Sequence, residues 1–280
     1  MSFLLPKSMD RPNKKAPPRR VDPGSIIAVA SGKGGVGKTF MSISLASAFA
    51  QAGQRTLLVD CDLGLPNVDV QLGIAPETDL AAVVAGWVEL EDAVYPIDGG
   101  PSQNGFDVLP GRSGSGTLAE LASDEVGRLA AGITALSLQY DRVILDLGAG
   151  VEANCMRLTR TADTALIVIT DDPASMTDGY AFIKILRGYA PNVEASIAVN
   201  HAKDRKAGQR TYEGVARACS TFLGIRPQLS GIVVRDEKVR EANIAQRTLF
   251  TCDPNCQPVL DVIAISQTML GKRQKTNMLF

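Results

Sequence analysis

Short apolar runs rich in β-branched residues alternate with longer stretches of helical periodicity from Ser25 towards the end of the chain. The short runs predict strands, and apolar residues spaced at i, i+3 and i+4 predict amphipathic helices. The expected strands are 26–30, 56–59, 106–109, 143–147, 166–170, 196–199 and 231–234. The expected helices are 38–51, 117–138, 154–161, 175–189, 208–222, 237–245 and 258–270.

Strands separated by helices indicate a parallel arrangement with right-handed crossovers. We therefore predict an α/β fold, a mostly parallel sheet flanked by helices on both faces, with ligands at the carboxyl ends of the strands. Residues 25–270 would form the one folded domain. Residues 1–24 hold five prolines among basic residues and are expected to be a flexible arm, and residues 271–280 are expected to be a tail.

Charge changes this picture because it is unevenly distributed. The formal net charge is −1, but residues 1–24 carry +4 and the last ten residues +3, which leaves the body at −8. A body of this charge argues against a uniformly basic nucleic-acid-binding protein, so specific nucleic-acid binding is not expected. Two basic ends on an acidic body suggest peripheral contacts at the termini.

The five cysteines are odd in number and scattered, and no secretory apolar region precedes them. Reduced thiols in the cytoplasm are the simplest interpretation. Cys252 and Cys256 form a lone C-x-x-x-C without a second pair, so a zinc site is not expected. No apolar stretch reaches the roughly 20 residues of a membrane-spanning helix.

Residues 31–39 read SGKGGVGKT, and they lie between the first expected strand and the first expected helix. A strand, a glycine-rich loop and a helix start in this order predict a P-loop, in which backbone N–H groups and the helix N-terminus hold phosphate. Lys38 would reach the β- and γ-phosphates, and the Thr39 hydroxyl would bind Mg²⁺. The phosphate cradle would consist of Gly34, Gly35, Val36 and Gly37. A simple glycine-rich turn is the alternative, but it leaves the second lysine, Lys33, unexplained.

Three aspartates lie at or just after the ends of expected strands. Asp60 and Asp62 straddle Cys61, so Asp60 could hold the hydration shell of Mg²⁺ while Asp62 orients or deprotonates the attacking water. A turn in which Asp and Asn side chains cap local N–H groups is the alternative. The run 142–146 ends in Asp146 and resembles a Walker B strand, in which the acid binds Mg²⁺ through water.

Two later strand ends are candidates for recognising the base. Asn200 has the donor and acceptor needed to bind an adenine edge, and Val234, Arg235 and Asp236 could form a wall against the ring. A polar residue that simply ends a strand accounts equally well for either segment.

With these residues in place, the chain resembles the MinD/ParA-type ATPases, whose deviant P-loop K-G-G-V-G-K-T matches residues 33–39. The resemblance covers about 25–260, and it implies a slow, Mg²⁺-dependent ATPase that forms a homodimer when ATP is bound. It also implies that Lys33 reaches the partner's nucleotide, that Lys38 is the P-loop lysine and that Asp62 activates water. Thr39, Asp60 and Asp146 would surround Mg²⁺.

Within this family the chain is most similar to the FlhG (FleN) branch, which regulates flagellar number and placement. The similarity lies in DLGLPNVDV at 62–70, LPGRSGSG at 109–116, DLGAG at 146–150 and SMTDGYAFIK at 175–184. It implies flagellar assembly components as partners: an FlhF-like GTPase, switch-complex proteins or a flagellar transcription regulator. A MinD- or ParA-like ATPase that positions the division site, the chromosome or another cargo is the alternative.

The chain departs from the family pattern at several positions. Phe40 stands where a small polar residue is common, so the α-phosphate would depend on the backbone N–H alone. Asp171 and Asp172 stand in place of a T-P-E-P-like run, and Val234 in place of a proline beside adenine. The arm lacks the D-Q-A-x-x-L-R segment with which FlhG proteins stimulate FlhF, which puts that role in question.

The C-terminal end is ambiguous in the sequence. Val259, Val262, Ile263 and Leu270 fit one helical face that Ser266 interrupts, which favours packing on the body. Residues 269–280 have apolar ends and a basic middle, so they could lie on an anionic membrane, and Gly271 weakens a helix there. The expected location is therefore cytoplasmic with a peripheral contact on the inner face of the cell membrane, and a frayed tail is the alternative.

Two further hypotheses belong to other functional classes. A ParA-like protein that binds DNA would use the basic stretch at 203–210, although such a stretch also suits a solvated helix start. A nucleotide-bound scaffold that does not hydrolyse ATP is suggested by Phe40 and Asp171.

Overall fold

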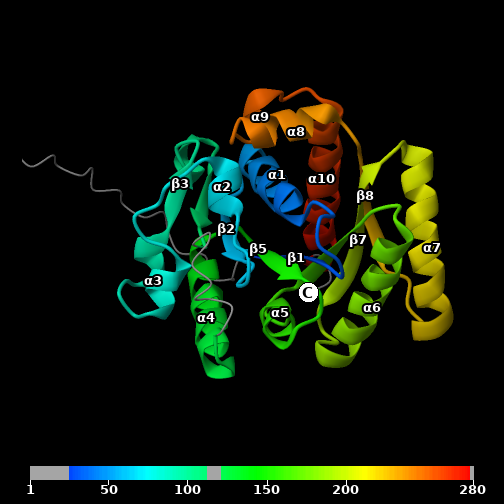
Figure 1. Cartoon of the computed structure of the whole chain (residues 1–280), viewed down its shortest axis with the longest axis horizontal. Coiled ribbons are helices and arrows are strands. Elements are labelled where there is room, and N and C mark those ends of the chain that lie inside the picture. Colours follow the sequence, from blue (N-terminus) through cyan, green and yellow to red (C-terminus); the bar gives the residue numbers. More distant parts are fainter. Residues whose placement is uncertain (1–24, 112–120, 278–280) are drawn as a thin grey trace, which may run out of the picture.

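A twisted, mostly parallel sheet runs through the centre of the protein, with helices on both of its faces (Figure 1). The computed structural model describes residues 25–111 and 121–277, the last six of these as backbone only. The expected arm at 1–24 and the end of the tail lie outside the described residues, as does the start of the helix expected at 117–138.

Within the described ranges the sheet has eight strands in the order β3-β4-β2-β5-β1-β6-β7-β8, and all of its pairs are parallel except β3 with β4. This confirms the predicted fold class. The strands are β1 Ser25–Ser31, β2 Thr56–Cys61, β3 Tyr95–Ile97, β4 Phe106–Leu109, β5 Arg142–Ala149, β6 Thr164–Ile169, β7 Glu194–Ala202 and β8 Gln228–Val234.

The helices that connect these strands include all seven that the periodicity predicts. They are α1 Lys38–Gln51, α2 Val68–Leu72, α3 Leu80–Val84, α4 Ser123–Leu136, α5 Ala153–Thr159, α6 Pro173–Tyr189, α7 Arg205–Leu223, α8 Glu237–Ile244, α9 Leu249–Cys252 and α10 Gln257–Asn277. Short 3₁₀ helices lie at η1 Leu90–Ala93, η2 Pro101–Gln103 and η3 Ser137–Gln139.

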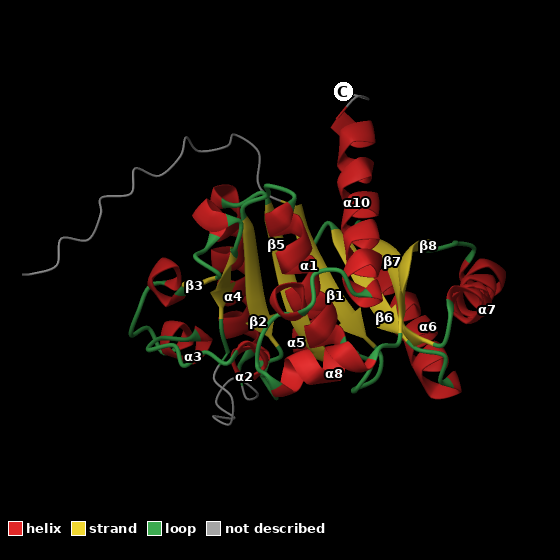
Figure 2. Cartoon of the chain, turned by 90° about the horizontal axis from the view of Figure 1, so that it is seen from above, coloured by secondary structure: helices red, strands yellow, loops and turns green. Residues whose placement is uncertain are grey.

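Burial on both faces explains why the strands read as continuous apolar runs. Along β1, Ile26, Ala28 and Ala30 belong to the core on one face, whereas Ile27 and Val29 belong to the core on the other. Residues of α4, α5, α6 and α7 complete the first core, and residues of α1, α9 and α10 complete the second (Figure 2).

The pattern did not predict β3, α2, α3 or α9. The strand β3 is three residues long, contains Pro96 and exposes Tyr95, so it lacks the apolar run of a central strand. It is the antiparallel edge of the sheet, a position where proline removes no hydrogen bond that the neighbouring strand needs. The three missed helices have only four or five residues, which is too short for a helical period to show.

The last helix continues beyond the expected boundary at residue 270. It runs to Asn277 without a break at Gly271, and it lies against α1 and β8. Val259, Val262, Ile265 and Met269 are buried in the core that α1 completes. Ser266 is also buried, and its hydroxyl donates to the Ile263 carbonyl at 2.8 Å, so a polar residue fits on this face without an unpaired group. The helix packs on the body, as its face predicts.

The order of the strands places a ligand site at the end of β1. The chain moves from β1 to β2 and β4, returns to β5, and then crosses β1 to β6. Crossovers therefore leave β1 in opposite directions, and open α/β sheets bind ligands at the carboxyl edge of such a point. The loop of residues 32–37 begins there.

A pair of glycines on α6 tests how closely the helices pack on the sheet. A Cβ at Gly179 would lie 2.6 Å from the Ile169 Cγ2 of β6, whereas a Cβ at Gly188 on the same helix meets nothing within 4 Å. Gly179→Ala should lower the free energy of unfolding by about 1–3 kcal/mol through overpacking. Gly188→Ala should raise it by up to about 1 kcal/mol through helix propensity. Urea unfolding of both variants measures the difference, and equal effects would show that α6 does not pack closely on β6.

Candidate functional site

The loop between β1 and α1 turns sharply at Gly35 and Gly37, whose φ values are +78° and +87°. A Cβ at Gly34 or Gly35 would meet nothing within 4 Å, so the backbone there is open to a ligand. A Cβ at Gly37 would lie 2.3 Å from Asn200 Nδ2, so only glycine fits that position without a shift. The structure thus has the exposed backbone cradle and the helix N-terminus that a P-loop needs.

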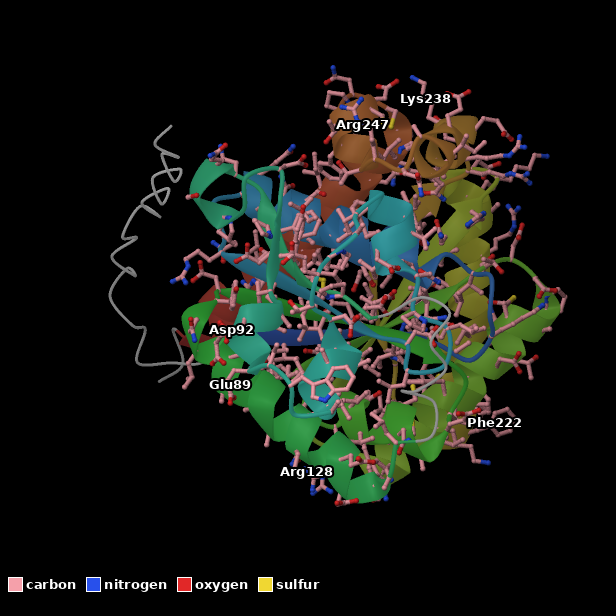
Figure 3. The ribbon with its side chains drawn as sticks, turned by 60° about the vertical axis from the view of Figure 1, so that its left-hand side comes forward. Glu89, Asp92, Arg128, Phe222, Lys238 and Arg247 are labelled. Carbon is pink, nitrogen blue, oxygen red and sulfur yellow. The ribbon has the colours of Figure 1, made fainter. Side chains whose placement is uncertain are left out.

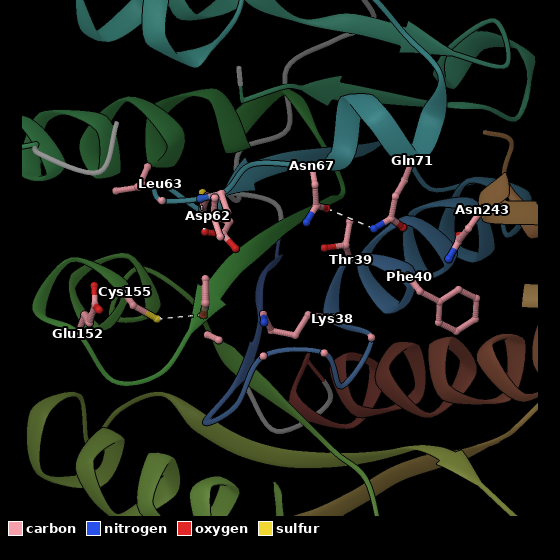
Figure 4. Close-up of a pocket in the computed structure, with 18 of the residues that line it drawn as sticks. Lys38, Thr39, Phe40, Asp62, Leu63, Asn67, Gln71, Glu152, Cys155 and Asn243 are labelled. Atoms are coloured by element: carbon pink, nitrogen blue, oxygen red, sulfur yellow. Dashed lines mark hydrogen bonds between the residues drawn. The ribbon is translucent and has the colours of Figure 1, made fainter. Parts of the chain in front are cut away.

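The loop opens into a cavity of about 650 Å³, a size typical of small-molecule sites. Figure 4 shows residues that line it, and they come from the P-loop and the start of α1, the loop after β2 with α2, the end of β5, the start of α5, the end of β7 and α8. Its walls include Gly34, Gly35, Gly37, Lys38, Thr39, Phe40, Asp62, Leu63, Gly64, Leu65, Asn67, Gln71, Gly148, Ala149, Glu152, Cys155, His201, Val239 and Asn243.

Lys38, Thr39 and Asp146 come together beside this cavity. Lys38 is buried, with 8 % of its surface exposed. Asp146 is also buried, and the Ser42 hydroxyl donates to its Oδ1 at 2.8 Å. Burial raises the pKa of Asp146 to about 6, although hydrogen bonds from Thr39 and Ser42 and the charge of Lys38 oppose the shift. A cation in the cavity would favour the ionised carboxylate further.

Asp60 lies opposite Asp146 in the register of β2 and β5, and its carboxylate is fully buried. Its Oδ2 accepts the N–H groups of Asn67 and Val68 at 3.0 Å each, and its Oδ1 accepts the N–H of Asp62 at 3.3 Å. Burial, followed by the charge of Asp146, raises the pKa of Asp60 well above its usual range. The carboxylate thus fastens both ends of the loop between β2 and α2 to the sheet, and it does not line the cavity.

Asp62 is the acid of this loop that faces the cavity (Figure 4). Its Oδ1 accepts the Leu65 N–H at 3.0 Å, which fixes the carboxylate relative to the loop. The same Oδ1 lies 3.1 Å from where a Cβ on Gly148 would stand, so the end of β5 approaches Asp62 closely. The loop is therefore built around both of its aspartates, one facing the sheet and one facing the cavity.

Lys33 is exposed at the outer rim of the loop, and its Nζ lies 2.5 Å from Asp172 Oδ2. Asp172 also caps α6 by accepting the Ser175 N–H. The hydrogen bond between the two side chains raises the pKa of Lys33 and lowers that of Asp172. In a single chain, Lys33 thus folds back on the start of its own α6.

A second cavity of about 240 Å³ adjoins the first, and it contains every residue proposed to recognise the base. It is lined by Asn200, His201, Val233, Val234, Arg235, Asp236, Glu237, Val239, Arg240 and Asn243. Asn200 is buried, and its Nδ2 donates to the Val36 carbonyl at 2.9 Å, so this residue braces the P-loop from β7. Asp236 accepts the Lys238 N–H as the cap of α8.

His201, Val239 and Asn243 line both cavities, and the sequence analysis did not single them out. The backbone of His201 has φ +56°, a left-handed conformation that is uncommon for residues other than glycine. Burial and the nearby charge of Arg235 lower the pKa of the imidazole. His201 follows Asn200 directly, so its position at a strand end was a usable signal, whereas Asn243 carries no motif and meets the site only through folding.

Phe40 is buried beside the first cavity, close to Asn243 and Gln71 (Figure 4). Gln71 on α2 donates to the Asn67 side chain at 3.2 Å, and its Oε1 is buried without a hydrogen-bond partner among the described residues. Phe40 therefore fills the space between α1, α2 and α8, and its backbone N–H is the group it offers to a ligand at the helix start.

These residues suit a nucleotide with its Mg²⁺ better than a metal held by protein alone. Within 25–111 and 121–277 no group of three or more His, Cys, Asp or Glu residues is arranged to hold a metal ion. A P-loop supplies Mg²⁺ with one hydroxyl and one acid, and the nucleotide and water supply the rest.

In the described part of the chain, no helix combines the length and apolar character needed to span a bilayer.

Comparison with known proteins agrees with this geometry. The model of the CobQ/CobB/MinD/ParA nucleotide binding domain matches residues 27–249. The antiactivator FleN of Pseudomonas aeruginosa is 34% identical over 245 residues, which cover 88% of this chain and 86% of FleN. The flagellum site-determining protein YlxH of Helicobacter pylori is 34% identical over 192 residues, 67% of this chain and 62% of that protein.

Solved structures share the fold at lower identity. The cell division ATPase MinD of Pyrococcus furiosus superposes with a TM-score of 0.74 at 23% identity, covering 89% of this chain and 99% of that one. MinD of Pyrococcus horikoshii in complex with Mg-ADP also gives a TM-score of 0.74, at 22% identity, covering 88% and 96%.

Proposed function

The chain belongs to the CobQ/CobB/MinD/ParA nucleotide-binding domain family, and from this we propose that it is an ATP-dependent dimerising switch that hydrolyses ATP and regulates flagellar number and placement. One observation carries the proposal: Lys38 and Thr39 of the P-loop line one cavity of nucleotide size together with Asp62, and Asp146 is buried next to Lys38 and Thr39. The similarity to FleN and YlxH supports the flagellar part.

In the proposed ATP complex, Lys38 would bind the β- and γ-phosphates, and the N–H groups of 34–40 would surround the phosphate oxygens. The Thr39 hydroxyl and the Asp146 carboxylate would hold Mg²⁺, which neutralises phosphate charge when bound. Asp60 would reach the metal only through water, because its oxygens already accept three backbone N–H groups. Binding or loss of the metal would therefore change the position of the loop at 62–68 through Asp60.

Asp62 would orient the attacking water and accept its proton. Its Oδ1 is held by the Leu65 N–H, which leaves Oδ2 as the oxygen available to the water. Because Asp62 lies on the loop that Asp60 fastens, a change at the metal site would shift the residue that activates water. Slow, switch-type turnover follows if this loop completes the site only in the dimer.

The nucleoside would extend from the P-loop cavity into the second cavity. The base would lie against Val234, Arg235 and Asp236, and Asn200 Oδ1 would accept from the adenine amino group while Nδ2 holds Val36. The ribose would then lie where the cavities meet, beside His201, Val239 and Asn243.

Lys33 would act in the dimer rather than in the single chain. Its ion pair with Asp172 is exposed on both sides, with 44% and 45% of the two side chains accessible, so it is easily exchanged. An ATP phosphate on a second subunit offers a stronger partner for the ammonium group than one solvated carboxylate. Dimerisation would thus transfer Lys33 from Asp172 to the nucleotide of the partner.

The proposed setting is the cytoplasm, with a peripheral membrane contact through 271–280, since the apolar face of α10 before these residues is buried. The proposed partners are flagellar assembly components such as an FlhF-like GTPase, switch-complex proteins or a transcription regulator. A positioning ATPase of another cargo is the second candidate, because the septum site-determining protein MinD of Bacillus subtilis is 32% identical over 58% of this chain.

Hydrolysis depends on the role of Asp62. The wild-type chain should release phosphate from ATP only with Mg²⁺, and Asp62→Ala should lower kcat by about 100-fold or more because the general base is lost. ATP affinity should change little. Asp69→Ala, an acid of the same segment that does not line the cavity, is the matched control. Absence of Mg²⁺-dependent phosphate release from the wild type would refute the ATPase proposal.

In this proposal, dimerisation depends on Lys33 leaving its ion pair with Asp172 and binding the nucleotide of the second subunit. In sedimentation experiments with a non-hydrolysable ATP analogue, Lys33→Ala should remain monomeric. Asp172→Asn, which keeps a residue able to cap α6, should dimerise at about two- to fivefold lower protein concentration because Lys33 is released. Lys203→Ala serves as a basic surface control. Normal dimerisation of Lys33→Ala would show that this lysine does not reach the partner.

The flagellar role makes a prediction in cells. Deleting the gene should change the number or position of flagella, and the wild-type gene should restore them. A chromosomal Lys33→Ala allele should behave like the deletion while the protein remains at its normal level. Unchanged flagella and motility in the deletion strain would favour a positioning role for another cargo.

A further inference from the structure

One stretch of the chain has acidic residues and no basic ones. Residues 56–111 contain ten Asp and Glu residues, and no Lys, Arg or His. They form β2, α2, α3, η1, β3, η2 and β4, which make up one edge of the molecule (Figure 1). Charge of one sign over such a region attracts a basic partner and repels an acidic one.

The single tryptophan of the chain lies on this edge, and 79% of its surface is exposed. Trp87 follows α3, and its backbone N–H donates to the Ala82 carbonyl at 3.0 Å. Four exposed acids lie in this region: Glu77 just before α3, and Glu89, Glu91 and Asp92 at η1. Figure 3 shows Glu89 and Asp92 on this side of the molecule. We call these five residues the Trp87 surface.

The segment that carries the Trp87 surface is firmly held. Asp79 is buried and caps α3 by accepting the Ala82 N–H at 2.9 Å, and the Leu80 N–H donates to the Pro110 carbonyl at 2.8 Å. The Thr78 hydroxyl bonds the Asp92 carbonyl at 3.2 Å. The indole is therefore presented by a braced turn, and an exposed aromatic side chain on a rigid support is typical of a binding surface.

We propose that the Trp87 surface binds the basic arm of the same chain, residues 1–24. The arm carries a net charge of +4, through Lys7, Arg11, Lys14, Lys15, Arg19 and Arg20 against Asp10 and Asp22, and it begins with the apolar run Phe3-Leu4-Leu5. Basic side chains complement the four acids, and an apolar or guanidinium group can cover the indole face.

The arm is a favourable occupant of the Trp87 surface because it is covalently joined to the body of the same chain. The arm joins the body at Ser25, the first residue of β1, and 24 extended residues can span up to about 80 Å. A tethered segment has an effective concentration of the order of millimolar, so weak charge pairs suffice to hold it. The other basic cluster has no such reach, because Lys272, Arg273 and Lys275 belong to α10.

Fluorescence of the full chain tests the proposal, since Trp87 is its only tryptophan. The triple variant Arg11→Glu, Lys14→Glu, Lys15→Glu should make acrylamide quenching of Trp87 severalfold more efficient than in the wild type and shift its emission to longer wavelength. High salt should do the same to the wild type, because it screens the charge pairs. The tail variant Lys272→Glu, Arg273→Glu, Lys275→Glu reverses the same number of charges and should leave Trp87 unchanged.

Equal quenching of the wild type and the arm variant, or an equal effect of the tail variant, would overturn the proposal. Protection of Trp87 that grows with protein concentration would also overturn it, since a second copy would then be the occupant. ATP affinity of the arm variant should equal that of the wild type, so these outcomes are separate from failure of the ATPase proposal.

Discussion

Two carboxylates held side by side in the buried centre of the sheet set the requirements for the rest of the site. Asp60 and Asp146 are paired in the register of β2 and β5, and burial raises the pKa of both. Two buried acids on neighbouring positions of adjacent strands are tolerated only when their charges are compensated. Three backbone N–H groups compensate Asp60, while Ser42, Thr39 and Lys38 compensate Asp146. The P-loop helix and the loop after β2 are therefore fixed by the same electrostatic constraint, and a bound cation would relieve it further.

This arrangement connects the proposed chemistry to the surface of the molecule. Asp60 ties the metal side of the sheet to the loop that carries Asp62, and Lys33 ties the P-loop to the start of α6 through Asp172. Under the proposed function, a bound nucleotide would act on the loop after β2 through Asp60, and a second subunit would take Lys33 from Asp172. A change at the phosphates would then reach two separate surfaces of the molecule.

Much of the fold could be predicted because the central strands are buried on both faces and their helices have long periods. The predicted strands all exist, and α1 begins and ends where expected. The edge strand β3 and the short helices escaped prediction because burial does not impose an apolar pattern on them. At the site, the P-loop and the acids after β2 and β5 were recognisable since their chemistry lies in consecutive residues or at strand ends. Asn243 was not, because only the packing of α8 brings it to the cavity.

The sequence by itself determined the glycine-rich loop, the parallel sheet and the set of acids, because these depend on local spacing and on the burial of strands. Tertiary structure decided what each polar side chain contacts. Asp60 faces the loop rather than the cavity, Asn200 braces Val36, and Lys33 pairs with a residue 139 positions away. It also decided that a stretch without basic residues forms one edge of the molecule with Trp87 exposed on it. Such contacts join segments far apart in the chain, so they follow from the register of the strands and the packing of the helices, which no local pattern encodes.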